Sequence, residues 1–224
     1  MKTLEFLKKD WLALLLLIAP VIMLWAYWNQ LPDQVPTRWN IWGELDSHQS
    51  KTKLLYTLLG VGIFVYTILA IIPYIDPKRN AERILKPLRV VRIAVMGFLA
   101  IVFGGIILNG AGYTVNLLLI VKVAIILLYL ILGNVMSKFP PNYFAGIRTP
   151  WTLEYPEIWR QVHRFGGKLW VAGALVLLIF VFLWDSFAYF MLFIAVTLIL
   201  ALVPTFYSYL LYRKIRQQGA VDTK

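Results

Sequence analysis

Six long apolar segments dominate this sequence and restrict what the chain can fold into. They cover residues 11–28, 54–75, 90–108, 115–135, 168–184 and 187–212. A helix rises about 1.5 Å per residue, so about 20 apolar residues cross the hydrocarbon core of a bilayer. Hydrophobic residues make up 60% of the chain, and its mean hydropathy is +0.72, which does not suit a soluble domain. The sequence therefore predicts an all-α, polytopic membrane protein with six transmembrane helices.

The first apolar segment has two interpretations, because a short basic lead precedes it. Lys2, Lys8 and Lys9 followed by apolar residues also describe a signal peptide. The segment ends in Trp25 and Trp28, however, and not in a small-residue cleavage pattern. We therefore expect an uncleaved first helix with aromatic residues at the membrane interface.

The distribution of basic residues predicts the orientation of the chain. If the N-terminus is inside, the inner segments carry 18 of the 22 Lys and Arg residues, and the outer segments carry three. This bias places both termini and the segment 133–168 in the cytoplasm.

The net charge of the chain is +11, and its basic residues lie beside the ends of the apolar segments, which argues against direct nucleic-acid binding. The chain has no cysteine, so disulfides and thiolate chemistry are excluded.

The segment 133–168 is the only long polar and aromatic connection in the inner half. Four prolines restrict its backbone and three glycines loosen it: Pro140, Pro141, Pro150, Pro156, Gly146, Gly166 and Gly167. A long, rigid connection of this kind is either a functional site or a stiff surface loop with aromatic anchors.

Pro156 is a helix-start signal, and we expect a short amphipathic helix on the inner surface that ends at Gly166-Gly167. In the inner connection 76–92, we expect Pro87 to end a basic turn.

These residues also resemble the SdpI family of bacterial membrane proteins. The resemblance is carried by GN at 133–134, PNYF at 141–144, GIRTPWTL at 146–153, and Trp159, His163 and GGK at 166–168. It implies immunity against a secreted, membrane-active peptide toxin, and a relay that sequesters a cytosolic repressor. The implied functional-loop residues are Asn134, Asn142, Gly146, Arg148, Thr149, Pro150, Trp151, Trp159, His163 and Gly167. Arg148 could contact a ligand or lock the loop onto the bundle.

The outer loop 29–53 resembles a domain of unknown function, DUF1648, that often precedes SdpI cores. The matching residues include Pro36, Trp39, Gly43 and Asp46, whereas Arg38 stands where that pattern usually has His. The resemblance divides the chain into an N-terminal part, 1–75, and a four-helix core, 76–224. The outer loop either meets an extracellular peptide or caps the helices at the interface.

Lys122 is the one basic residue expected deep inside a span. A bare ammonium in lipid is costly, so this side chain either snorkels to the interface or pairs with an acid such as Asp185, Asp46 or Glu44.

We expect no catalytic residues, metal or cofactor, because His48 and His163 lie on opposite faces and no catalytic motif is present. The partners implied are the lipid bilayer, a peptide toxin and a cytosolic repressor. Two other functions stay open, a peptide exporter or transporter and a membrane enzyme acting on lipid or cell-wall intermediates.

Overall fold

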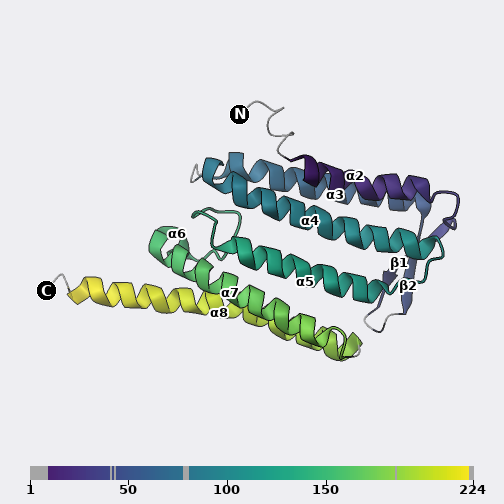
Figure 1. Cartoon of the computed structure of the whole chain (residues 1–224). Helices are drawn as coiled ribbons and strands as arrows, with labels where there is room; N and C mark the ends of the chain where they lie inside the picture. Colours follow the sequence, from purple (N-terminus) through teal and green to yellow (C-terminus); the bar gives the residue numbers. More distant parts are fainter. Residues whose placement is uncertain (1–9, 41, 43, 78–80, 185, 222–224) are drawn as a thin grey trace.

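The computed structural model describes residues 10–40, 42, 44–77, 81–184 and 186–221. Six helices run side by side in an elongated bundle, a two-stranded hairpin lies at one end, and a short helix lies at the other (Figure 1). The elements in chain order are α2 (Trp11–Ala26), β1 (Gln34–Trp39), β2 (Leu45–Ser50), α3 (Lys51–Ile75), α4 (Ala81–Gly110), α5 (Leu117–Met136), α6 (Pro150–Glu154), α7 (Pro156–Phe180) and α8 (Ser186–Val221).

Five of these helices, α3, α4, α5, α7 and α8, are long and apolar enough to cross a membrane. The chain is therefore a multi-pass membrane protein. The predicted count of six spans is not confirmed, because the described part of α2 has only 16 residues. Sixteen residues of helix reach about 24 Å, less than the roughly 30 Å of a hydrocarbon core.

The prediction of a purely α-helical chain is wrong for the outer loop, which forms an antiparallel β-hairpin. Gln34 pairs with Ser50, and Pro36 pairs with His48, with irregular register on either side of Arg38. At the turn, the Asn40 side-chain oxygen accepts hydrogen bonds from the backbone N–H groups of Trp42 (3.0 Å) and Glu44 (2.9 Å). This side-chain turn supports the hairpin locally.

The hairpin is held against the helices by an apolar cluster. Val35 of β1 is fully buried, and it packs with Leu24, Leu31 and Leu54. The two strands therefore cap the ends of α2, α3 and α4.

The segment 156–168 is not a separate surface helix, which corrects the prediction. It is the first half of α7, which continues through Gly166-Gly167 to Phe180. The glycines permit a close crossing with α5: a Cβ on Gly167 would lie 2.6 Å from the carbonyl oxygen of Gly133. Small residues let two helix backbones approach in this way. Tertiary packing of α5 against α7 therefore overrides the local tendency of two glycines to end a helix.

Pro87 does not end a turn either, because it lies inside α4. Proline in a helix interior costs about 3 kcal/mol or more. The neighbouring residues Ile84 and Leu88 are almost fully buried, in a cluster with Val135 and Trp159. Burial of two such side chains stabilises by about 3–6 kcal/mol, which is enough to carry the helix through the proline.

Candidate functional site

The predicted functional loop is shorter in the structure than the segment 133–168. Gly133 and Asn134 belong to α5, and residues 156–168 belong to α7. The remaining connection consists of residues 137–149 and the single-turn helix α6, at the end of the bundle opposite the hairpin (Figure 1). Asn134 is exposed on α5.

Asn142 organises the first half of this loop. Its buried side-chain amide donates to the carbonyl oxygens of Pro140 (2.9 Å) and Ala145 (3.0 Å). Its side-chain oxygen accepts from the backbone N–H groups of Phe144 (2.9 Å) and Ala145 (2.7 Å). All four hydrogen-bonding positions of the amide are thus used on the loop's own backbone.

His163 fixes the second half of the loop to α7. Its Nε2 accepts a hydrogen bond from the Ile147 N–H (3.0 Å), so Nδ1 carries the hydrogen that is donated to the Trp159 carbonyl (2.9 Å). The ring also stacks on Trp159 at 3.9 Å between centroids. Trp159 in turn donates from Nε1 to the carbonyl of Phe139 (2.8 Å). Two residues of α7 therefore hold both ends of the loop.

The start of α6 is attached to α8. Thr149 caps α6 by a reciprocal capping box with Thr152, and Pro150 occupies the first helical position. Trp151 donates from Nε1 to the Ser208 hydroxyl (2.6 Å) and stacks on Tyr212 of α8. Trp151 is thus an anchor between α6 and α8.

Arg148 is the exposed charged residue at this end of the loop. The Nη1 nitrogen of its guanidinium donates to the carbonyl oxygen of Tyr143 (2.6 Å), and no further hydrogen bond of Arg148 exists among the residues described. Arg148 also lines a cavity of about 440 Å³ whose other walls are mainly apolar. These walls come from α4, α5, α7, α8 and the loop: Val91, Leu132, Val135, Met136, Phe139, Ala145, Gly146, Ile147, Trp170, Leu200, Ala201 and Thr205. This volume lies within the roughly 300–1,000 Å³ that is usual for small-molecule binding sites.

The outer-loop candidates lie at the opposite end, so they form a separate group. Arg38 and Asp46 pair across the hairpin at 2.5 Å. Pro36 and Trp39 lie in β1, and Gly43 is outside the described residues.

Lys122 places its ammonium 4.6 Å from the ring centre of Tyr189 on α8. Of the acids considered as its partner, Asp46 pairs with Arg38, Glu44 accepts from Asn40 (2.9 Å), and Asp185 is not described.

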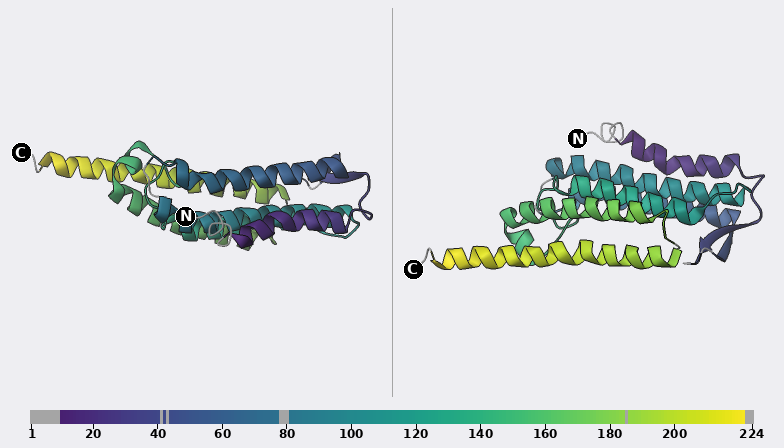
Figure 2. Two further views of the ribbon diagram at one scale, coloured as in Figure 1. Left: turned by 90° about the horizontal axis from the view of Figure 1, so that it is seen from above. Right: turned by 60° about the horizontal axis from the view of Figure 1, so that its bottom comes forward.

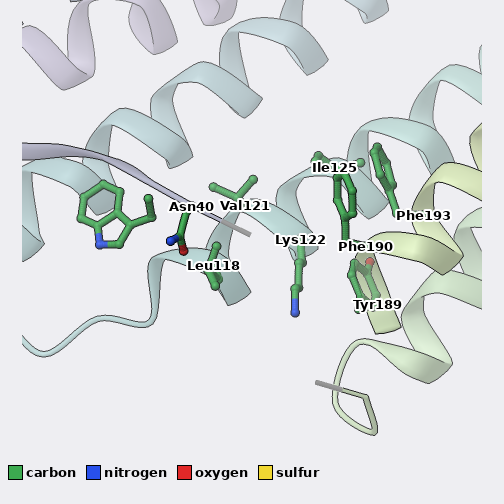
Figure 3. Close-up of a pocket in the computed structure, with 9 residues that line it drawn as sticks. Asn40, Leu118, Val121, Lys122, Ile125, Tyr189, Phe190 and Phe193 are labelled. Atoms are coloured by element: carbon green, nitrogen blue, oxygen red, sulfur yellow. The ribbon is translucent and has the colours of Figure 1, made fainter. Parts of the chain in front are cut away.

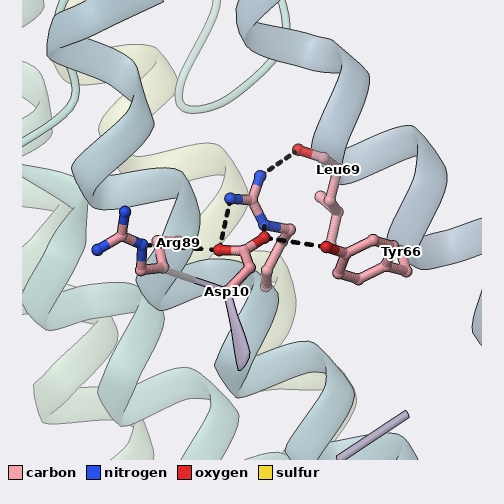
Figure 4. A network of polar contacts seen from close by, with 5 residues as sticks. Asp10, Tyr66, Leu69 and Arg89 are labelled. Carbon is pink, nitrogen blue, oxygen red and sulfur yellow. Dashed lines mark hydrogen bonds and ion pairs between the residues drawn. The ribbon is translucent and has the colours of Figure 1, made fainter. Parts of the chain in front are cut away.

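A buried ion-pair network, which the sequence did not predict, lies at the start of α2. Asp10 and Arg92 are each 1% exposed, and they contact at 2.8 Å and 2.9 Å (Figure 4). Tyr66 donates its hydroxyl to Asp10 (3.1 Å), Arg92 also donates to the carbonyl of Leu69 (3.1 Å), and Arg89 lies 3.6 Å from the carboxylate. The sequence feature that could have predicted this network is the position of its charges: Asp10 directly precedes one apolar segment, and Arg92 lies in the first turn of another. The network joins α2 and α3 to α4.

The geometry defines a multi-pass membrane protein with a rigid loop and an apolar cavity at one end of its helices. Comparison with known proteins gives matches for both parts of the chain. Residues 138–208 match the SdpI/YfhL protein family, and residues 15–70 match a domain of unknown function, DUF1648. The chain is 24% identical over 210 residues to Immunity protein SdpI of Bacillus subtilis (strain 168), covering 93% of this chain and 98% of that protein. The resemblance to the SdpI family is therefore confirmed. No solved structure matches the chain.

Proposed function

We propose that this protein is a membrane immunity protein that protects its host from a secreted, membrane-active peptide toxin. The observation that carries the proposal is the similarity to Immunity protein SdpI, which extends over 93% of the chain. The structure adds a rigid loop whose backbone is held by Asn142, His163 and Trp151. Such a loop keeps Arg148 at the edge of an apolar cavity. This arrangement suits binding better than chemistry.

The proposed topology places the loop and both termini in the cytoplasm, with six spans and the hairpin outside. It divides the chain into residues 1–75 and a core of residues 76–224. The exposed basic end of α8, with Arg213, Lys214 and Arg216, extends past the bundle (Figure 2). In this orientation it would present positive charge to a cytosolic regulator, whose sequestration is the second part of the proposal.

Single cysteines test this topology, because the chain has none of its own. We expect Ser47→Cys in the hairpin to react with an impermeant thiol reagent added to intact cells. Ser137→Cys, in the loop, should react only after the cells are opened. Labelling of position 137 in intact cells, with protection of position 47, would invert the model.

The role of Arg148 can be separated from simple positive charge. Arg148→Lys keeps the charge but loses the planar fork of donors, so we expect survival under toxin to fall at least about tenfold at matched abundance. Arg160→Lys on α7 is the matched control, because Arg160 is exposed and pairs with Glu157 within the same helix. Full protection by Arg148→Lys would assign Arg148 to the loop scaffold alone.

The experiment that tests the function is expression of the gene in a toxin-sensitive strain. The strain is then challenged with the secreted peptides encoded near the gene, and survival is compared with an empty-vector strain. We expect protection by the wild-type protein. Equal killing of the two strains, with the protein present in the membrane, would reject the proposal.

A further inference from the structure

The cavity of about 440 Å³ beside Arg148, which we call the loop cavity, extends from the loop into the helix bundle. Gly146 and Arg148 line it at the loop. Farther walls come from Leu132, one turn before the end of α5, and from Leu200, which belongs to the buried cluster between α5, α7 and α8. The charged group thus lies at one end of the cavity, and apolar side chains line the rest.

The walls of the loop cavity are accessible to an occupant. Leu132, Ala145, Ile147 and Trp170 are half-buried, and Ala201 is exposed on α8. Apolar side chains without close neighbours on one side lose dispersion contacts, which a hydrocarbon chain would supply. A water molecule takes about 30 Å³ in the liquid, and a methylene group is of similar size, so the cavity has room for a chain of about 15 carbon atoms.

Arg148 offers hydrogen-bond donors at the loop end of this cavity. Its guanidinium has five N–H donors, and Nη1 donates to the carbonyl oxygen of Tyr143. No carboxylate of the described residues forms an ion pair with Arg148. The backbone on either side is held, because Ile147 donates to His163 (3.0 Å) and Thr149 caps α6. The remaining donors of the planar fork match a carboxylate, which can accept two parallel hydrogen bonds.

We propose that the loop cavity binds one long-chain fatty acid. Its carboxylate pairs with Arg148, and its chain lies along Leu132, Trp170 and Ala201. The volume holds one such chain and not the two chains of a phospholipid.

A peptide segment suits the loop cavity less well than a hydrocarbon chain. The backbone N–H and C=O groups of a peptide need hydrogen-bond partners when they leave water. Besides Arg148, the polar side chains of the lining are Thr205 and the indole of Trp170. The Thr205 hydroxyl already donates to the carbonyl oxygen of Ala201 (2.7 Å). A hydrocarbon chain needs no such partners.

A smaller cavity of about 260 Å³ lies at the hairpin end, between β1, α5 and α8 (Figure 3). Its charged residue is Lys122, whose ammonium lies over the ring of Tyr189. Val121 of α5 also lines it. This hairpin-end cavity therefore serves as the matched control for variants that fill the loop cavity.

The test is photo-crosslinking of the full-length purified protein in detergent with a palmitic acid analogue that carries a diazirine on its chain. We expect crosslinks to Leu132, Trp170 and Ala201. Unlabelled palmitate should compete at least about tenfold better than hexadecanol, which has the same chain without the carboxylate, because charge-assisted hydrogen bonds are lost. Arg148→Met should remove this difference. Ala201→Phe, which fills the cavity, should reduce crosslinking at least about fivefold.

The controls are Lys138→Met, which removes an exposed positive charge from the same loop, and Val121→Phe, which fills the hairpin-end cavity. Both should crosslink as the wild type does. Arg148 is exposed in the loop, so Arg148→Met keeps the test decisive if Ala201→Phe fails to fold. Equal competition by palmitate and hexadecanol in the wild type, or crosslinks unchanged by Arg148→Met, would overturn the proposal.

A competition arm with apolar peptides distinguishes the other source of a carboxylate. A peptide with a free C-terminal carboxylate is compared with its amidated form. Stronger competition by the free peptide than by palmitate would overturn the fatty-acid proposal and assign the cavity to a peptide. This inference goes beyond immunity and is tested without toxin, so its failure is distinct from a failure of protection in the survival experiment.

Discussion

Asp10→Ala should destabilise the folded protein by about 3–5 kcal/mol, the usual cost of removing one partner from a buried ion pair. The substitution leaves Arg92, which is 1% exposed, without its carboxylate. It also leaves the Tyr66 hydroxyl without its acceptor and removes the ion pair of Arg89. The measurement is the unfolding midpoint of the purified protein in a titration with denaturing detergent.

Arg92→Met should cost less than Asp10→Ala. After this substitution, Asp10 still accepts a hydrogen bond from Tyr66, and Arg89 is 3.6 Å away. The double variant Asp10→Ala with Arg92→Met should be more stable than Asp10→Ala alone, because it leaves no unpaired buried guanidinium. Asp33→Ala is the control: its carboxylate is 94% exposed, and its contact with Lys51 should contribute at most about 1 kcal/mol. A double variant that shows the full sum of the two single losses would mean that the pair does not act as a unit.

Gly146→Ala should disrupt the loop more than any other single methyl group added there. Gly146 has φ +113°, which residues with a side chain rarely adopt. An added Cβ would also lie 2.2 Å from Nε2 of His163, the atom that accepts the Ile147 hydrogen bond. Backbone strain and overpacking together should cost about 2–5 kcal/mol. We expect the loop to become protease-sensitive while the helices stay folded.

The variant Gly112→Ala separates backbone strain from overpacking, the two causes of the loss of stability expected in Gly146→Ala. Gly112 also has a positive φ (+94°), but an added Cβ there would meet nothing within 4 Å. This control should therefore show only the cost of strain, about 1–3 kcal/mol, and leave the loop resistant to protease. Limited proteolysis between residues 137 and 149 measures the difference. An intact, resistant loop in Gly146→Ala would contradict the role assigned to His163.

The helices could be predicted from the sequence because apolar length is a local property. The hairpin could not, since β2 reads LDSHQS and shows no alternation of apolar and polar residues. The continuity of α7 also depends on distant residues. Gly166-Gly167 resembles a helix end locally, and only the contact of Gly167 with Gly133 shows why the helix continues there.

The sequence predicts which segment contains the candidate site, but it does not predict the contacts that shape this segment. Proline and glycine spacing marked the loop, yet the contact of Gly146 with His163 joins two elements and cannot be read from spacing. Asp10 and Arg92 are 82 residues apart. In the sequence each resembles an ordinary charge at the end of a span, so only the fold reveals that they pair.

The proposed immunity acts by binding, so we expect the protein to protect the membrane without exporting or degrading the toxin. The measurement is the membrane potential of toxin-treated cells, recorded with a voltage-sensitive dye, together with the amount of labelled toxin bound to the same cells. We predict that cells with the wild-type protein keep their potential while binding as much toxin as empty-vector cells, and that Arg148→Lys cells depolarise at that same toxin load. Retained potential accompanied by loss of bound toxin would contradict the claim and indicate export or degradation. Depolarisation equal to that of the empty-vector cells would contradict protection itself.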